Sequence, residues 1–132
     1  MKDFVSDGVI IGRHIKGADL KSGLSFFTEE SDYLQLGSWR YDKGRKLSAH
    51  IHNYVKREIN RTQECIVVMA GSIKVIMYDE GGEFLEEVRV NSGEAMVLFS
   101  GGHGYEILDN DTIVFEIKNG PYPGAEKDRR RI

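Results

Sequence analysis

Residues 63–90 read QECIVVMAGSIKVIMYDEGGEFLEEVRV, and this stretch predicts three consecutive strands. Its first part, Gln63–Ala70, is a continuous apolar run, as expected for a strand that is covered on both faces. Ser72–Tyr78 and Phe84–Val90 flank the sequence DEGGE, whose glycines permit the positive φ of a tight turn. These two segments therefore predict a β-hairpin.

Further short strands are expected on both sides of this centre. They are Leu34–Tyr41, Lys46–His52, Ala95–Phe99, one strand between Gly102 and Asp109, and Thr112–Lys118. The best helical candidate, Tyr54–Gln63, lacks an apolar stripe and is expected to be a long loop. Many short strands separated by glycine-rich turns predict an all-β fold, either a sandwich or a barrel.

The chain has 132 residues, which fits a single domain with one core. We expect the barrel core at about residues 34–118, N-terminal strands or an arm at 1–33, and a charged, solvated tail at 125–132, which ends in EKDRRRI. The apolar run Val9–Ile11 suggests an arm that pairs with a second copy, so we expect a homodimer.

Composition excludes several function classes. Lys and Arg number 18 and Asp and Glu 21, so the net charge is 18 − 21 = −3, which disfavours nucleic acid as a partner. No apolar run approaches the ~20 residues of a membrane helix, and the N-terminus has no signal-peptide core. The single cysteine, Cys65, excludes an internal disulfide and a cysteine-based zinc site. We therefore expect a cytoplasmic protein in which His and carboxylate groups hold any metal.

Two of the four histidines have metal-ligand spacing. On a strand, His50 and His52 would project from one face with Cβ atoms roughly 7 Å apart, about twice the rise per residue. Two imidazoles at that spacing can bind one ion, although two exposed histidines on a polar face would look the same. His14 shows no partner pattern and is expected at the surface.

Glu64 and His103 complete a candidate site. Glu64 opens the most apolar segment of the chain, where a buried carboxylate needs a partner, and Arg57 or Arg61 could be that partner instead of a metal. His103 lies between glycines that allow a tight turn and an inward-facing ring, but a solvent-facing turn histidine is equally compatible. Cys65 is expected to face away from Glu64 and to have no role as a nucleophile.

The spacing of these residues resembles the two-part signature of the cupin superfamily. Gly44-x5-His50-x-His52 and Glu64-x6-Gly71 resemble the first motif, G-x5-H-x-H-x3–4-E-x6-G, and Gly93 with His103 resembles the second. The resemblance implies a double-stranded β-helix (jelly roll, the cupin barrel) and one divalent metal ion, which is Fe, Mn, Ni, Zn or Cu. The metal ligands implied are His50, His52, Glu64 and His103. Eleven residues separate His52 from Glu64, which leaves Glu58 as a rival carboxylate ligand.

The resemblance also suggests what the pocket binds. The chain is loosely similar to small cupins of surface-polysaccharide and nucleotide-sugar pathways, which points to carbohydrate metabolism. From their place in the insertion between two ligand positions, Arg57 and Arg61 would contact a phosphate or carboxylate group, although solvated loop charges would look the same. Gln63 and Tyr105 would orient the ligand, with Tyr105 a candidate catalytic residue, unless Tyr105 only fills the barrel. We expect a metal-dependent isomerase, epimerase or oxygenase acting on a small anionic or sugar-derived metabolite. The alternative is a non-catalytic module that binds a sugar or another metabolite.

Overall fold

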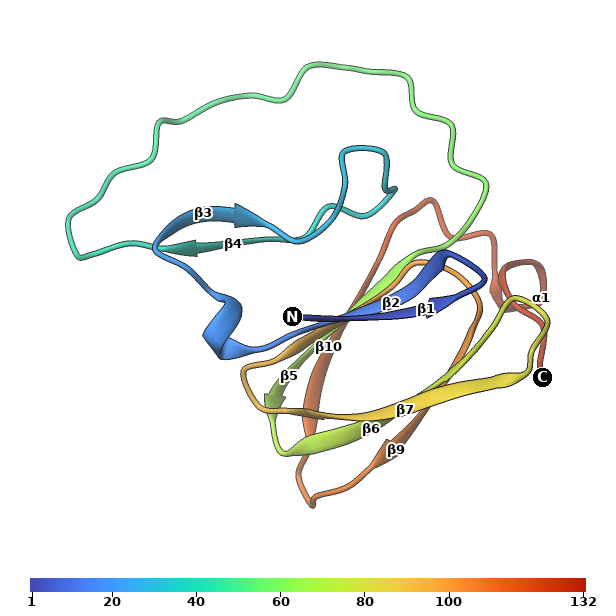
Figure 1. Ribbon diagram of the computed structural model, residues 1–132. Coiled ribbons are helices and arrows are strands. Elements are labelled where there is room, and N and C mark those ends of the chain that lie inside the picture. Colours follow the sequence, from blue (N-terminus) through green and yellow to red (C-terminus); the bar gives the residue numbers. More distant parts are fainter.

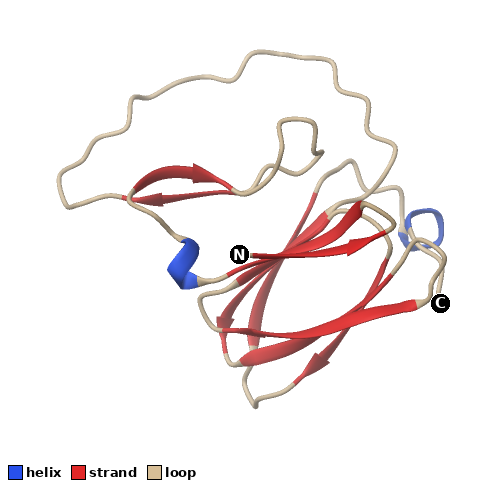
Figure 2. Cartoon of the chain, in the orientation of Figure 1, coloured by secondary structure: helices blue, strands red, loops and turns tan.

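The strands of this chain run antiparallel throughout and form three sheets (Figures 1 and 2). The computed structural model describes residues 1–132. The strands are β1 (Lys2–Ser6), β2 (Val9–Ile15), β3 (Gly23–Phe26), β4 (Gly37–Arg40), β5 (Glu64–Ala70), β6 (Ser72–Tyr78), β7 (Phe84–Asn91), β8 (Ala95–Leu98), β9 (Gly102–Ile107) and β10 (Ile113–Lys118). A 3-10 turn spans Gly17–Asp19, and one short helix, α1, spans Ala125–Asp128. The all-β class predicted from the sequence is confirmed.

Two of the sheets share one core. The five-stranded sheet has the order β1-β2-β8-β5-β10, and the three-stranded sheet has the order β7-β6-β9. The first sheet contributes Phe4, Ile66, Val68, Met96 and Leu98 to a single buried cluster, and the second contributes Ile73, Val75, Met77 and Val90. The two sheets therefore pack face to face, and burial of this apolar surface stabilises the arrangement.

The other face of the five-stranded sheet is also covered. A second buried cluster consists of Ile15, Phe27, Cys65, Val97 and Phe99, with partly buried leucines of residues 20–36 packed against it. Strand β5 thus has apolar neighbours on both faces, which explains its continuous apolar sequence. As expected, Cys65 faces this second cluster, whereas Glu64 shares its face with Ile66 and Val68.

The central hairpin is confirmed. Strands β6 and β7 pair from Ser72 with Asn91 to Tyr78 with Phe84. In the turn between them the backbone N–H of Glu83 donates to Oδ1 of Asp79 at 2.9 Å, and Gly82 has a φ of +92°. The predicted strands at residues 95–99, 102–109 and 112–118 are also present, as β8, β9 and β10.

The strand predicted at Lys46–His52 is wrong. These residues lie in a long segment between β4 and β5 that contains neither helix nor strand. Figure 1 shows the segment arching away from the sheets. The alternation of Leu47, Ala49 and Ile51 is not sufficient, because a strand also needs a neighbouring strand to satisfy its backbone hydrogen bonds. As predicted, residues 54–62 form a loop.

The N-terminal residues belong to the main sheet. The run Val9–Ile11 opens β2, which pairs with β1 on one side and β8 on the other. It is therefore not the free arm from which a homodimer was inferred, and the homodimer stays a prediction. No helix in this structure has the length and apolar composition needed to cross a membrane.

Candidate functional site

A polar cavity of about 890 Å³ opens at the end of the sheets where β5 and β9 begin and β10 ends. Its walls include Glu64 from β5, His103 and Tyr105 from β9, and Lys118 from β10. The C-terminal segment 127–132 supplies a further part of the lining. The cavity therefore brings together titratable groups from the five-stranded sheet, the three-stranded sheet and the charged C-terminal segment.

Glu64 is the centre of this cavity wall. Its side chain is only 5% exposed, and three neighbours contact its carboxylate. The hydroxyl of Tyr105 donates to Oε1 at 2.5 Å, Nζ of Lys118 lies 3.1 Å from Oε2, and Nε2 of His103 lies 3.5 Å from Oε2. Because both oxygens are partnered, the buried charge is compensated.

The strand registers explain this convergence. Lys118 is the direct antiparallel partner of Glu64 in the β5–β10 pair. His103 and Tyr105 are two residues apart on β9, so they share a strand face. Strands β5 and β9 belong to different sheets, and the contacts of Glu64 connect those sheets across the open end.

A glycine turn positions β9. Gly101 has a φ of +68°, and a Cβ added to it would lie only 2.3 Å from the backbone oxygen of Tyr78. Only glycine therefore fits between β8 and β9 at this point. His103, which follows this turn, lines the cavity with its side chain 30% exposed.

The cluster changes the acidity of its members. Burial alone would raise the pKa of Glu64, but hydrogen bonds from His103, Tyr105 and Lys118 and the charge of His103 outweigh burial and lower the pKa to about 2. Burial and the adjacent carboxylate of Glu64 raise the pKa of Tyr105, so its hydroxyl remains a donor. Burial opposes the charge of Lys118, but Glu116 and Glu64 raise its pKa and keep it protonated.

The structure separates the four residues expected to bind metal. Glu64 and His103 lie together, whereas His50 and His52 lie on the exposed segment between β4 and β5, with ring centroids 4.9 Å apart. No group of three or more His, Cys, Asp or Glu side chains is placed to hold a metal ion. Imidazole and carboxylate donors suit divalent cations, but in this arrangement they form two separate pairs and not one site.

The other residues expected to line the ligand pocket also lie in different parts of the structure. Arg61 lines the cavity but is paired with Glu80 at 2.8 Å. Arg57 and Glu58 are exposed on the long segment, where Glu58 contacts only Lys56, at 3.4 Å. The backbone N–H of Leu34 donates to Oε1 of Gln63 at 3.0 Å.

Gln63 has a structural role. It is buried, and its own backbone N–H donates to Asn119 at 2.6 Å. Gln63 therefore joins the end of the long segment to the residues before β4 and after β10, and its role in orienting a ligand stays a prediction.

Two parts of the cavity wall were not foreseen. Lys118 closes the strand predicted at residues 112–118, and only the pairing of that strand with β5 reveals it as a neighbour of Glu64. The tail 125–132 is mostly exposed, and its residues Lys127, Arg129 and Arg130 also line the cavity. The run of charges in the tail was visible in the sequence, but its return to the sheets was not.

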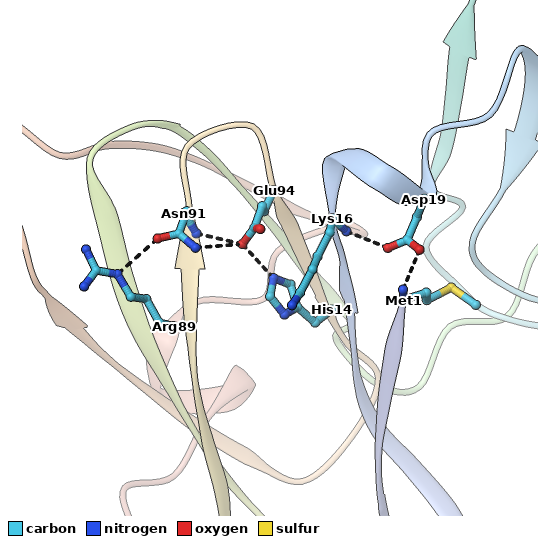
Figure 3. Close-up of polar contacts among 7 residues, drawn as sticks. All are labelled: Met1, His14, Lys16, Asp19, Arg89, Asn91 and Glu94. Atoms are coloured by element: carbon cyan, nitrogen blue, oxygen red, sulfur yellow. Dashed lines mark hydrogen bonds and ion pairs between the residues drawn. The ribbon is translucent and has the colours of Figure 1, made fainter.

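A second histidine–carboxylate pair lies at the other end of β8 (Figure 3). His14 was predicted at the surface, and this is wrong, since it is only 2% exposed. Its Nε2 lies 2.9 Å from Oε2 of Glu94, which also accepts the backbone N–H of Asn91 at 2.9 Å. Burial alone would raise the pKa of Glu94, but the hydrogen bonds from Asn91 and His14 lower it.

Comparison with known protein families, with curated proteins and with solved structures finds no match to this chain.

Proposed function

We propose that this protein is an isomerase or epimerase that binds a small polar metabolite in the cavity and moves a proton within it. The observation that carries the proposal is the relation of His103 to Glu64. The imidazole of His103 is 30% exposed, while the carboxylate beside it is 5% exposed. A histidine that meets a cavity and has a buried carboxylate next to it is a common arrangement for general acid–base catalysis.

The proposed chemistry uses groups that are already in place. His103 removes a proton from a carbon next to a carbonyl group, and the electron pair of the broken C–H bond moves toward the carbonyl oxygen. The carboxylate of Glu64 stabilises the imidazolium that forms. Lys118 also lines the cavity and offers positive charge to the developing oxyanion. Return of the proton from His103 to the former carbonyl carbon, with the hydroxyl proton of the α-carbon passing to the oxyanion, completes isomerisation. Delivery of a proton by water to the opposite face of the α-carbon completes epimerisation.

We also infer that the fold is a jelly roll of the cupin type. The residues that resemble the cupin motifs support this proposal by their positions. Glu64 begins β5, Gly71 has a φ of +70° in the turn between β5 and β6, and His103 lies on β9. Gly71 is needed at that turn because an added Cβ would lie 3.1 Å from Cα of Thr112 and nearer still to its hydroxyl.

A metal-dependent form is the second candidate. It is favoured by the two neighbouring imidazoles of His50 and His52 and by the pair formed by Glu64 and His103. The long segment carries the first pair, so its movement toward β9 would be needed to join all four groups around one divalent cation. Such a cation, when bound, supplies Lewis-acid or oxygen-activating chemistry.

Deuterium incorporation tests the proposal. The protein is incubated in D2O with a panel of small keto acids and keto sugars, and NMR follows exchange at the carbon next to the carbonyl. His103→Asn and Glu64→Gln should each reduce exchange by about a hundredfold or more, since a positioned acid–base group contributes about 10²–10⁴-fold. Glu106→Gln is the matched control, because Glu106 lies on the same strand but pairs with Lys74 outside the cavity.

The same assay separates the alternatives. Exchange that persists in the His103→Asn protein contradicts the assignment of the base. Exchange that stops with a chelator and returns with one divalent metal favours the metal-dependent form, and His50→Ala/His52→Ala should then abolish it. Saturable binding with no exchange for any compound identifies a non-catalytic binding module.

A further inference from the structure

The hairpin of β3 and β4 forms a sheet of its own, and Figures 1 and 2 show it set apart from the two large sheets. Leu24 is the direct partner of Trp39 across the hairpin, and Phe26 is the partner of Gly37. A Cβ added to Gly37 would lie 3.1 Å from the ring of Phe26, so that ring lies over the glycine. Leu24, Phe26 and Trp39 therefore form one apolar surface, which we call the hairpin face.

The hairpin turns its apolar face toward solvent. Leu24, Phe26 and Trp39 are 51%, 63% and 69% exposed. The opposite face carries Ser38, whose hydroxyl is buried and has no hydrogen-bond partner. A buried hydroxyl without a partner costs free energy, and a two-stranded hairpin alone is only marginally stable in water. This orientation is therefore expected when another apolar surface covers the hairpin face.

A second exposed apolar surface lies on β10, at the edge of the five-stranded sheet. Phe115 and Ile117 pair with Val67 and Cys65 of β5 and share their face of the sheet. The second buried cluster covers this face over β2, β5 and β8 but contains no residue of β10. We call the uncovered part the β10 face, and its residues, which are 44–59% exposed, are Met69, Ile113, Phe115 and Ile117.

The charges beside the two faces are of opposite sign. Residues 40–46, which end β4 and follow it, contain four basic residues and one acidic residue, so their net charge is 4 − 1 = +3. Near β10, Asp111 precedes the strand and forms no ion pair. Glu116 shares Lys118 with Glu64, so one cation serves two carboxylates. The end of the hairpin in one copy is therefore electrostatically complementary to β10 in another.

The area of the two faces suits a dimer. With roughly 200 Å² for each fully exposed side chain, their seven residues present on the order of 800 Å² per copy. A stable protein–protein interface buries about 800 Å² on each partner. We propose that this chain forms a two-fold homodimer in which the hairpin face of each copy covers the β10 face of the other. The inference is independent of the proposed function, and it assigns the dimer contact to elements other than the run Val9–Ile11.

Size-exclusion chromatography with light scattering, over a dilution series of the full chain, tests the dimer. The unaltered chain should have twice the mass of one chain at micromolar concentration. Trp39→Glu and Phe115→Glu should each raise the dissociation constant at least a hundredfold, because each substitution places a charge in both contacts of the two-fold interface. Phe84→Glu is the matched control, since Phe84 is 62% exposed on β7 and lies outside both faces, and it should leave the mass unchanged.

A mixture of the two variants tests which surfaces meet. The hairpin face of the Phe115→Glu protein and the β10 face of the Trp39→Glu protein are both unaltered, so one of the two contacts can form between them. We therefore expect heterodimer in the mixture at a concentration where neither variant dimerises alone. If each face instead packed on the same face of the other copy, every contact in the mixture would contain a substituted residue, and no heterodimer would form.

Four further results contradict the proposal. They are a monomeric unaltered chain, an assembly larger than a dimer, a dimer that survives either substitution, and equal dissociation by Phe84→Glu. If a variant does not fold, as judged by circular dichroism and thermal unfolding, Phe26→Ser replaces the substitution in the hairpin face and Ile113→Ser the one in the β10 face. Each of these should weaken association at least tenfold, and unchanged association in either one would overturn the assignment of that face.

Discussion

The two histidine–glutamate pairs at opposite ends of β8 differ in which partner is more deeply buried. In the pair of His14 and Glu94, the imidazole is 2% exposed and the carboxylate 16% exposed. In the pair of His103 and Glu64, the imidazole is 30% exposed and the carboxylate 5% exposed. Glu94 is held by its own turn through Asn91, whereas Glu64 is held by residues of two other strands.

This difference indicates what each pair does. A buried imidazole cannot contact a ligand, so His14 joins the end of β2 to the turn before β8. In the function we propose, the imidazole of His103, which lies at the cavity beside a buried carboxylate, exchanges a proton with the bound molecule. Which partner is more exposed therefore distinguishes the pair with a structural role from the pair for which we propose a chemical role.

The largest effect on stability is expected at the glycine that positions the strand of His103, the histidine of the exposed pair. Gly101→Ala places a side chain at a φ of +68° and 2.3 Å from the backbone of Tyr78. We expect the free energy of unfolding to fall by about 3 kcal/mol, measured by chemical denaturation. Gly104→Ala is the control, because nothing lies within 4 Å of a Cβ there. Equal losses in the two variants would show that the turn does not constrain β9.

The next effect distinguishes the two histidines. His14→Ala removes a buried ring and a hydrogen bond to a carboxylate, so the free energy of unfolding should fall by about 2–3 kcal/mol. His103→Ala should cost less than about 1 kcal/mol, because Glu64 keeps Tyr105 and Lys118 as partners. A larger loss from His103→Ala than from His14→Ala would reverse the roles assigned to the pairs.

The pair of His14 and Glu94 should make stability depend on pH. The pKa of Glu94 in the folded chain is lowered from its ordinary value of 4.5, so the folded state binds its proton less readily than the unfolded state. The stabilisation is therefore complete above about pH 4.5 and declines as the pH falls toward the folded pKa. The stability difference between the unaltered chain and Glu94→Gln should be constant at neutral pH and shrink below pH 4.5. A difference that grows on acidification would contradict this sign.

The smallest effect is expected in the segment that contributes to neither pair. Insertion of Gly-Ser-Gly-Ser after Arg57 lengthens a loop that is already long, and loop-closure entropy rises only slowly with length. The free energy of unfolding should change by less than about 0.5 kcal/mol. The same insertion after Gly81 should cost more, since it interrupts the turn bonded between Asp79 and Glu83. A large loss from the first insertion would mean that the segment packs more tightly in solution.

The sequence predicts the strands of this fold better than it predicts their neighbours. Residues 63–118 combine apolar runs with glycine turns at short spacing, and almost all of their strands were foreseen because both signals are local. Lys46–His52 shows the same alternation but no adjacent strand, so the pattern alone was misleading. Pairing depends on contacts between distant residues, which local periodicity does not contain.

The same reasoning applies to the candidate site. Glu64 and His103 were identified because each interrupts a strong local pattern, a carboxylate opening an apolar strand and a histidine among glycines. His14 has its partner 80 residues away, in a turn that looks unremarkable in the sequence. Charge predicts the exposure of the tail, but nothing in EKDRRRI shows that Ile132 lies against Gly82 and Gly102.

The position of Cys65 gives the protein an internal reporter. This thiol, the only one in the chain, is 1% exposed on the strand that carries Glu64, and burial together with the charge of Glu64 raises its pKa to about 11. Thiolate is the form that reacts with alkylating and disulfide reagents, so the folded chain should resist labelling. The rate of labelling then measures how often β5 separates from its neighbours, and any molecule that holds the cavity closed should slow that rate in proportion to its binding.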